Sequence, residues 1–162
     1  MYETADERTA LQALLDSSRS AATSHLREIV TDDHALSASA LLTRLDGMKV
    51  LSLATVTRTG EPRISAVDGH FIHGSWTFGT DGRSAKARHL HARPAVSAAY
   101  VDGERLGFFT HGKVEPLEES DAYFDRIVDH WTDHYGSNPL TWGDDIRMFR
   151  IRASWCVAYA GA

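Results

Sequence analysis

The stretch that decides the fold reads WTFGTDGRSAKARHLHAR over residues 76–93. Its pattern predicts a short strand that runs through a turn into a helix over residues 84–92. The first turn of a helix carries partial positive charge from N–H groups without partners, so basic side chains are unfavourable there. This helix nevertheless begins among three basic residues, Arg83, Lys86 and Arg88. The sequence therefore predicts that another group balances the charge.

A bound anion would balance the charge at this helix start. The hydroxyl groups of Thr80 and Ser84 flank the turn, and free backbone N–H groups at a helix start are natural phosphate ligands. We therefore expect a phosphate group to be held by Thr80, Arg83, Ser84 and Lys86. The alternative is a basic helix face that is simply solvated.

The composition indicates a single globular domain. The chain has 162 residues, of which 43% are hydrophobic, and this suffices for a core without disulfide or metal support. The formal net charge of -5 and the pI near 5.9 argue against a general nucleic-acid-binding protein, which needs a basic surface. Cys156 is the only cysteine, which excludes an internal disulfide and a multi-cysteine zinc site. No secretory signal and no apolar run of ~20 residues is present, so we expect a cytoplasmic protein with no membrane partner.

Hydrophobic periodicity divides the chain into short elements. Apolar residues three and four apart predict helices over residues 6–30, 37–45 and 118–135, in addition to the basic helix. Alternating and β-branched residues predict strands over residues 49–56, 63–70, 71–72, 76–78, 95–101, 106–115 and 146–159, with a bend or bulge at the glycines of 106–115. The strands follow one another through hairpins without a βαβ rhythm. A small barrel with peripheral helices is therefore favoured over a doubly wound sheet.

Five of these segments together resemble one known family. They are Leu53-Ala54-Thr55-Val56, Pro62-Arg63-Ile64-Ser65-Ala66-Val67, Trp76-Thr77-Phe78-Gly79-Thr80, Ser84-Ala85-Lys86-Ala87-Arg88-His89-Leu90 and Arg93-Pro94-Ala95-Val96-Ser97. In this order and spacing, residues 49–115 resemble the pyridoxamine phosphate oxidase-like flavin-binding split barrels. The resemblance implies a mainly β (α+β) fold, an antiparallel split β-barrel of Greek-key type with peripheral helices. It also implies a homodimer that holds a flavin or a deazaflavin in a groove between the subunits.

The resemblance also divides the chain and assigns cofactor-binding residues. Within a single domain, we expect residues 1–46 to form a helical segment packed on the barrel and residues 47–162 to form the flavin-binding split barrel. The residues that match the strand beside the flavin ring and ribityl chain are Arg63, Ile64, Ser65, Ala66 and Val67. Those that match the phosphate-holding turn are Thr80, Arg83, Ser84 and Lys86, of which Lys86 matches the family's cationic contact to phosphate.

The resemblance implies an oxidoreductase, with one departure from the family pattern. True pyridoxamine phosphate oxidases have Arg and His residues near the C-terminus that grip the substrate phosphate, and residues 152–160 contain nothing similar. We therefore expect FMN-dependent hydride transfer to an unidentified small substrate rather than oxidation of pyridoxamine phosphate. The cofactor supplies the redox chemistry in such enzymes, so no catalytic side chain is assigned.

Two alternatives to an FMN-dependent enzyme stay open. Four further basic residues extend the patch beyond one phosphate, and they are Arg88, His89, His91 and Arg93. Such a patch would suit the longer acidic tail of a deazaflavin coenzyme, and hence a deazaflavin-dependent reductase. The same barrel could also serve as a non-catalytic flavin carrier or sensor.

Several residues outside the basic stretch carry separate expectations. His130 and His134 lie four apart on a predicted helix, as a metal pair can, but we expect an exposed polar face there and no metal site. His70 is expected either to line a pocket or to face solvent. Trp142 lies in a loop and is assigned to packing at a dimer interface, and Cys156 is assigned to a buried, inert position.

Overall fold

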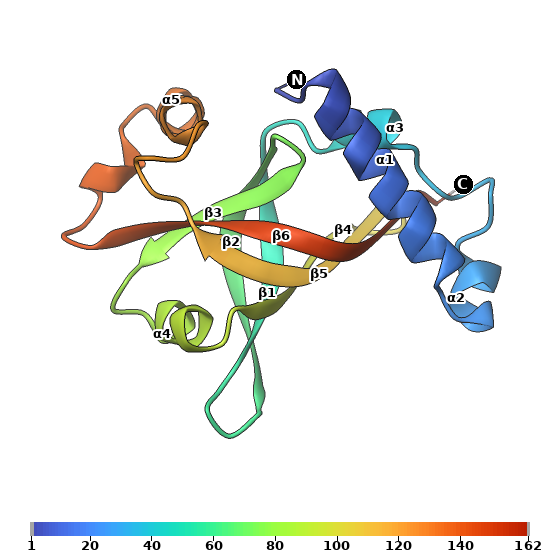
Figure 1. The fold of residues 1–162 in the computed structure, drawn as a ribbon, viewed down its shortest axis with the longest axis horizontal. Helices are drawn as coiled ribbons and strands as arrows, with labels where there is room; N and C mark the ends of the chain where they lie inside the picture. The colour runs from blue at the N-terminus through green and yellow to red at the C-terminus, as the bar shows by residue number, and fades with distance from the viewer. Residues whose placement is uncertain (1, 162) are drawn as a thin grey trace.

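Six antiparallel strands close into a barrel in the computed structural model, which describes residues 2–161 (Figure 1). Neighbouring strands follow the order β1-β2-β3-β6-β5-β4, and β4 pairs with β1 to close the barrel. The strands are β1 (Met48–Val56), β2 (Pro62–Ile72), β3 (Ser75–Asp81), β4 (Ala95–Asp102), β5 (Leu106–Pro116) and β6 (Ile146–Tyr159). The antiparallel, mainly β barrel predicted from the sequence is therefore confirmed.

Helices surround the barrel. They are α1 (Ala5–Ser20), α2 (Ser24–Ile29), α3 (Ala38–Arg44), α4 (Ala85–Ala92), α5 (Phe124–Tyr135) and the 3-10 helix η1 (Pro139–Thr141). In Figure 1, α1, α2 and α3 lie on one side of the barrel, whereas α4 and α5 lie on the other. Within residues 2–161, no helix combines the length and the apolar character that crossing a membrane requires.

Large apolar side chains fill the barrel interior. Successive residues of a strand point to opposite faces, so every second residue of these strands can reach the interior. The core side chains with at most 1% of their surface exposed include Leu51, Leu53, Phe78, Phe108 and Ile151. Burying one such side chain stabilises a fold by about 1.5–3 kcal/mol, so this core is the main support of the barrel.

Helix α1 packs across β6. Leu11 and Leu15 of α1 are buried in the same cluster as the barrel core. The Ser18 hydroxyl of α1 accepts a hydrogen bond from the backbone N–H of Cys156 at 3.0 Å. The burial predicted for Cys156 is confirmed, and this burial raises the pKa of its thiol to about 12.

The helical stretch predicted over residues 6–30 is two helices. The structure interrupts it at residues 21–23, between α1 and α2. Thr23 has extended backbone geometry, and its hydroxyl accepts a hydrogen bond from the backbone N–H of Leu26. Thr23 is thus the N-cap of a new helix, a local signal that hydrophobic periodicity does not register.

The helix predicted over residues 118–135 begins later than expected, at Phe124. The Asp121 carboxylate accepts hydrogen bonds from the backbone N–H of Glu118 at 2.8 Å and from Nη2 of Arg150 at 3.0 Å. These contacts hold the chain in turns where a first helical turn was predicted. Four residues along one side of α5 are buried, Phe124, Ile127, Val128 and Trp131.

The bulge predicted at the glycines of β5 occurs at Gly112, but the extra residue lies on β6. His111 pairs with Trp155 and Gly112 with Ala153, which leaves Ser154 of β6 without an opposite residue. A Cβ at Gly112 would lie 2.1 Å from the carbonyl oxygen of Arg152, so no larger residue fits this close approach of the two strands. The pairing of β5 with β6 continues on both sides of the bulge, so the barrel stays closed.

Candidate functional site

A cavity of about 350 Å³ lies between β2, β3, the start of α4 and the end of α5. Four of the residues assigned to the cofactor line it, namely Ala66, Val67, Thr80 and Lys86. Ala66 and Val67 belong to β2, Thr80 to β3 and Lys86 to the first turn of α4. The structure therefore brings the predicted strand and the predicted turn to one cavity, called the β2–α4 cavity below.

The start of α4 presents two hydroxyl groups next to this cavity. Ser84 is the N-cap of α4, and its hydroxyl accepts a hydrogen bond from the backbone N–H of Ala87 at 3.1 Å. The hydroxyl groups of Thr80 and Ser84 lie 3.2 Å apart. The first turn of α4 contains no acidic residue. Donors and partial positive charge therefore gather at this turn, as an anion would require.

Lys86 and Arg83 differ in how their charges are balanced. Arg83 holds Asp81 with two donors, Nε at 3.1 Å from Oδ1 and Nη2 at 2.7 Å from Oδ2. Side-chain and backbone hydrogen bonds from Arg83 lower the pKa of Asp81 to about 2. Lys86 is half-buried, and among residues 2–161 no partner forms an ion pair or hydrogen bond with its ammonium group. The β2–α4 cavity thus has one cation without a direct partner in the described part of the chain, Lys86, and two carboxylates, Asp68 and Asp81, of which Asp81 is held by Arg83 from outside the cavity.

Three of the assigned strand residues lie outside the cavity, toward the end of the β1–β2 hairpin that projects from the barrel (Figure 1). Arg63 pairs with Glu61 at 3.1 Å, Ile64 is 76% exposed, and Ser65 is half-buried. A single chain therefore does not bring these residues together with Lys86. Their contact with a cofactor stays a prediction.

Aromatic side chains from α5 and the following loop form the far wall of the β2–α4 cavity. These are Trp131, Tyr135 and Trp142. A Cβ at Gly79 would lie 3.1 Å from Cζ3 of Trp131, so glycine lets this ring approach β3. The Tyr135 and Trp142 rings meet edge to face, 4.8 Å between centroids. The indole nitrogen of Trp131 is buried without a hydrogen-bond partner. Helical spacing places Trp131 and Tyr135 on the inner side of α5, but it does not show that they face a cavity.

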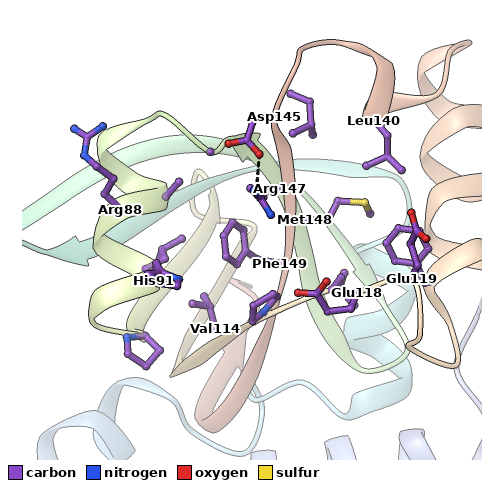
Figure 2. A pocket seen from close by; sticks show the side chains of 18 residues that line it. Arg88, His91, Val114, Glu118, Glu119, Leu140, Asp145, Arg147, Met148 and Phe149 are labelled. Atoms are coloured by element: carbon purple, nitrogen blue, oxygen red, sulfur yellow. Dashed lines mark ion pairs between the residues drawn. The ribbon is translucent and has the colours of Figure 1, made fainter.

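A second and larger cavity of about 750 Å³ lies beside α4 (Figure 2). Arg88 and His91 reach it from α4, and the ion pair between Asp145 and Arg147 lies at its rim, with 2.5 Å between Oδ1 and Nε. Figure 2 shows these charged groups around a floor of apolar side chains, Phe149 among them. We call this the α4–β6 cavity.

The other two basic residues of the α4 segment hold it to β1. The His89 ring lies 3.0 Å from the hydroxyl of Thr55, and Arg93 Nε donates a hydrogen bond to the carbonyl oxygen of Val56 at 2.9 Å. The basic residues that would extend one continuous groove beyond Lys86 are therefore divided between the α4–β6 cavity and β1.

His70 neither lines the cavity nor faces solvent, so both expectations for it are wrong. It is 1% exposed, and its Nδ1 lies 3.0 Å from Nε2 of His130. The exposed face predicted for His130 is also wrong, since His130 is half-buried, whereas His134 is exposed. Within the part of the chain that the structure describes, no group of three or more His, Cys, Asp or Glu residues could hold a metal ion.

The sequence matches the model of one protein family, described as pyridoxamine 5′-phosphate oxidase, over residues 38–158. The match includes α3, all of β1 to β5 and nearly all of β6. A search of curated proteins finds no significant match.

Solved structures share the barrel at low sequence identity. A conserved hypothetical protein from Mycobacterium tuberculosis matches with a TM-score of 0.67 and 23% identity, covering 80% of this chain and 88% of that one. An F420 reductase matches with a TM-score of 0.55 and 21% identity, covering 70% of this chain and 93% of that one. A pyridoxamine 5′-phosphate oxidase-related, FMN-binding protein from Nostoc punctiforme matches with a TM-score of 0.52 and 17% identity, covering 68% of this chain and 74% of that one. At such identities these likenesses show the fold.

Proposed function

Since this chain belongs to the pyridoxamine 5′-phosphate oxidase-like family of FMN-binding split barrels, we propose that it binds FMN in the β2–α4 cavity and transfers hydride between the flavin and a small substrate. The observation that carries the proposal is Lys86, a half-buried cation without a partner among residues 2–161. A cation without a partner at the wall of a cavity can form a charge-assisted hydrogen bond with an anionic ligand there.

The phosphate group of FMN fits the start of α4. A phosphate needs short donors from several directions, and charge-assisted donors are the strongest. Thr80 and Ser84 offer hydroxyl groups, Lys86 offers an ammonium group, and the helix start offers backbone N–H groups. The three side chains come from the two ends of one tight turn, so the residues present fit the group.

The remaining walls suit the flavin ring. Trp131, Tyr135 and Trp142 offer aromatic surface, and the small side chain of Ala66 leaves the β2 backbone accessible on the other side. FMN, when bound, supplies the hydride chemistry. These residues would hold the ring in place and keep water away from it, while the indole N–H of Trp131 is a buried donor without a partner.

The cavity favours FMN over a deazaflavin coenzyme. Both would place a phosphate at Lys86, but the longer acidic tail of the deazaflavin needs further cations along the same groove. Arg88 and His91 line the α4–β6 cavity instead, and Arg93 is bonded to β1. Among the residues that line the β2–α4 cavity, Lys86 is the one cation, and one cation suits a single phosphate.

Binding of FMN to the purified protein tests this proposal directly. We expect Lys86→Ala to weaken FMN binding by about 1–3 kcal/mol, or about 5- to 150-fold in Kd, as for loss of a charge-assisted hydrogen bond. Titration with FMN, followed by quenching of flavin fluorescence, measures the change. Arg88→Ala is the matched control, because it removes a cation from the same helix that lines the other cavity.

Three outcomes would overturn the assignment. Equal loss of affinity in the two variants would show that the phosphate does not lie at Lys86. Tighter binding of a deazaflavin coenzyme than of FMN would overturn the choice of cofactor, and a protein that binds neither would remove the oxidoreductase function. A protein that binds FMN but does not oxidise or reduce it with any hydride donor or acceptor would support a carrier or sensor.

We infer that the working form is a homodimer. Exposed apolar side chains lie on three adjacent strands, Val50 on β1, Ile64 on β2 and Val101 on β4, and such a patch is typical of an interface. Ala66 shares a strand face with Ile64, since the two are two residues apart. Ala66 also lines the β2–α4 cavity, so a partner subunit on this face would lie next to the bound cofactor.

The dimer can be tested at the exposed apolar patch. We expect Ile64→Glu to convert a dimer into a monomer in sedimentation equilibrium at micromolar concentration, because a buried unpaired charge opposes association. Ile29→Glu is the control, since Ile29 is also exposed but lies on α2. A wild-type protein that is monomeric at these concentrations would contradict the inference.

A further inference from the structure

A chain of hydrogen bonds runs from the protein surface to the β2–α4 cavity. The Tyr2 hydroxyl lies 2.8 Å from Nδ1 of His130, and Nε2 of His130 lies 3.0 Å from Nδ1 of His70. Nε2 of His70 lies 3.1 Å from the Tyr135 hydroxyl, which donates to Oδ2 of Asp68 at 3.4 Å. Tyr2 is 45% exposed, whereas Tyr135 and Asp68 line the cavity. Four consecutive hydrogen bonds therefore join solvent to the wall of the proposed cofactor site.

The central histidine of this chain is neutral. Burial lowers the pKa of His70 to about 3, and the neighbouring rings of His130 and His134 act in the same direction. Burial and His134 also lower the pKa of His130. Asp46 and Asp133 oppose that decrease. A neutral imidazole has one N–H donor and one acceptor nitrogen, so His70 can pass a hydrogen bond along in one direction at a time.

The carboxylate at the cavity end sets the direction. Asp68 accepts and cannot donate when ionised, so the Tyr135 hydroxyl donates to it and its oxygen accepts from Nε2–H of His70. Nδ1 of His70 is then the acceptor for Nε2–H of His130. Nδ1 of His130 in turn accepts from the Tyr2 hydroxyl. In this arrangement each ring nitrogen and hydroxyl of the chain has a hydrogen-bond partner, and each donor N–H or O–H points toward the cavity.

We propose that Tyr2, His130, His70 and Tyr135 form a proton relay that carries protons from solvent to a ligand in the β2–α4 cavity. The proposal rests on the function proposed above, since a substrate that accepts hydride from a reduced flavin also needs a proton. Tyr135 is the member that reaches the cavity and would contact the substrate. His70 and His130 are positioning residues that act through it.

The protons balance in one passage of the relay. The Tyr135 hydroxyl turns from Asp68 and gives its proton to the reduced substrate, and it regains one from Nε2 of His70. His70 receives a proton on Nδ1 from Nε2 of His130, His130 receives one on Nδ1 from Tyr2, and Tyr2 takes one from water. No net charge remains on the protein. Both histidines have changed from the Nε2–H to the Nδ1–H tautomer, and each returns to the Nε2–H tautomer by losing its Nδ1 proton to water and taking one at Nε2 from water during a local opening.

The tautomers can be read in the cofactor-free protein by ¹⁵N NMR of the histidine side chains. We expect Nε2–H for His70 and His130 in the wild type, and Nδ1–H for both in Tyr135→Phe, because the variant removes the acceptor at the cavity end. Tyr2→Phe removes only a donor at the surface end, so both should stay Nε2–H. Unchanged tautomers in Tyr135→Phe, or a charged His70 at pH 7, would overturn the relay.

Proton movement along the chain is measured by exchange of the His70 ring N–H with D₂O. We expect Tyr2→Phe to slow this exchange at least about tenfold while the backbone amides of β2 exchange as before, which a purely structural role would not produce. Equal exchange rates would contradict the relay. Both measurements need no cofactor, so failure of the relay and failure of FMN binding would be distinguished.

Discussion

Two cavities beside α4 differ in volume and in charge balance. The α4–β6 cavity is about twice as large, at about 750 Å³ against about 350 Å³, and its rim holds the paired charges of Asp145 and Arg147 (Figure 2). The β2–α4 cavity holds Lys86, whose ammonium group has no partner within residues 2–161. The FMN site is therefore proposed on the cation without a partner and not on cavity volume.

The floor of the larger cavity belongs to the barrel core. Phe149 is 6% exposed and stacks on Phe78 with 5.5 Å between ring centroids. We expect Phe149→Ala to lower the free energy of unfolding by about 3–5 kcal/mol, the usual cost of removing a buried aromatic ring. Urea unfolding measures this loss, and FMN titration of the folded variant should give an unchanged Kd. A large loss of FMN affinity would place the ligand in the α4–β6 cavity.

The histidine behind the smaller cavity makes stability depend on pH. The pKa of His70 is about 3 in the folded protein and 6.5 in its ordinary range. The unfolded chain therefore binds a proton below pH 6.5 that the folded protein does not. The contribution of neutral His70 to stability is thus fully present above pH 6.5 and is lost as pH falls toward 3. Between pH 6.5 and 5, we expect the free energy of unfolding of the wild type to fall by about 1–2 kcal/mol more than that of His70→Asn. One pKa unit corresponds to about 1.4 kcal/mol.

Urea unfolding at several pH values measures this dependence. His91→Asn is the control, because His91 is exposed and lines the α4–β6 cavity. The free energy of unfolding of His91→Asn should depend on pH as in the wild type. If the free energy of unfolding of His70→Asn also changed with pH as in the wild type, the burial of His70 would not hold its pKa low.

The smallest effect is expected at Arg83, which the resemblance assigned to phosphate. Its charge is already balanced by Asp81, and exposed pairs of this kind contribute little. We expect Arg83→Ala to change the Kd for FMN by less than about threefold, a loss smaller than that of Lys86→Ala. Fluorescence titration with FMN measures both. A loss as large as that of Lys86→Ala would mean that Arg83 leaves Asp81 when the cofactor binds.

The parts of the molecule that could be predicted are those with local signals. Hairpin turns and alternating residues mark the strands, and the turn from Thr80 to Lys86 carries its hydroxyl groups and cations within seven positions of the chain. The start of α5 was misplaced because the Asp121 carboxylate bonds to Arg150, a residue of the distant strand β6. Such a contact has no local trace in the sequence.

The aromatic wall and the histidine chain could not be predicted for the same reason. Helical spacing places Trp131 and Tyr135 on one side of α5, but it does not say that β3 carries a glycine opposite the Trp131 ring. His70 and His130 are 60 positions apart, and their contact depends on how α5 lies on the barrel. Fold-level resemblance located the cavity, and tertiary packing determined which side chains complete it.

The contact between Ser18 of α1 and the backbone of Cys156 gives the protein a built-in reporter of local opening. The thiol is 1% exposed and its pKa is raised to about 12, so a thiol reagent should react only when the packing around Cys156 opens. Because Cys156 is the only cysteine of the chain, the labelling rate needs no engineered site and reports on one event. How often this part of the core opens could thus be timed in the unmodified protein, with and without its ligand.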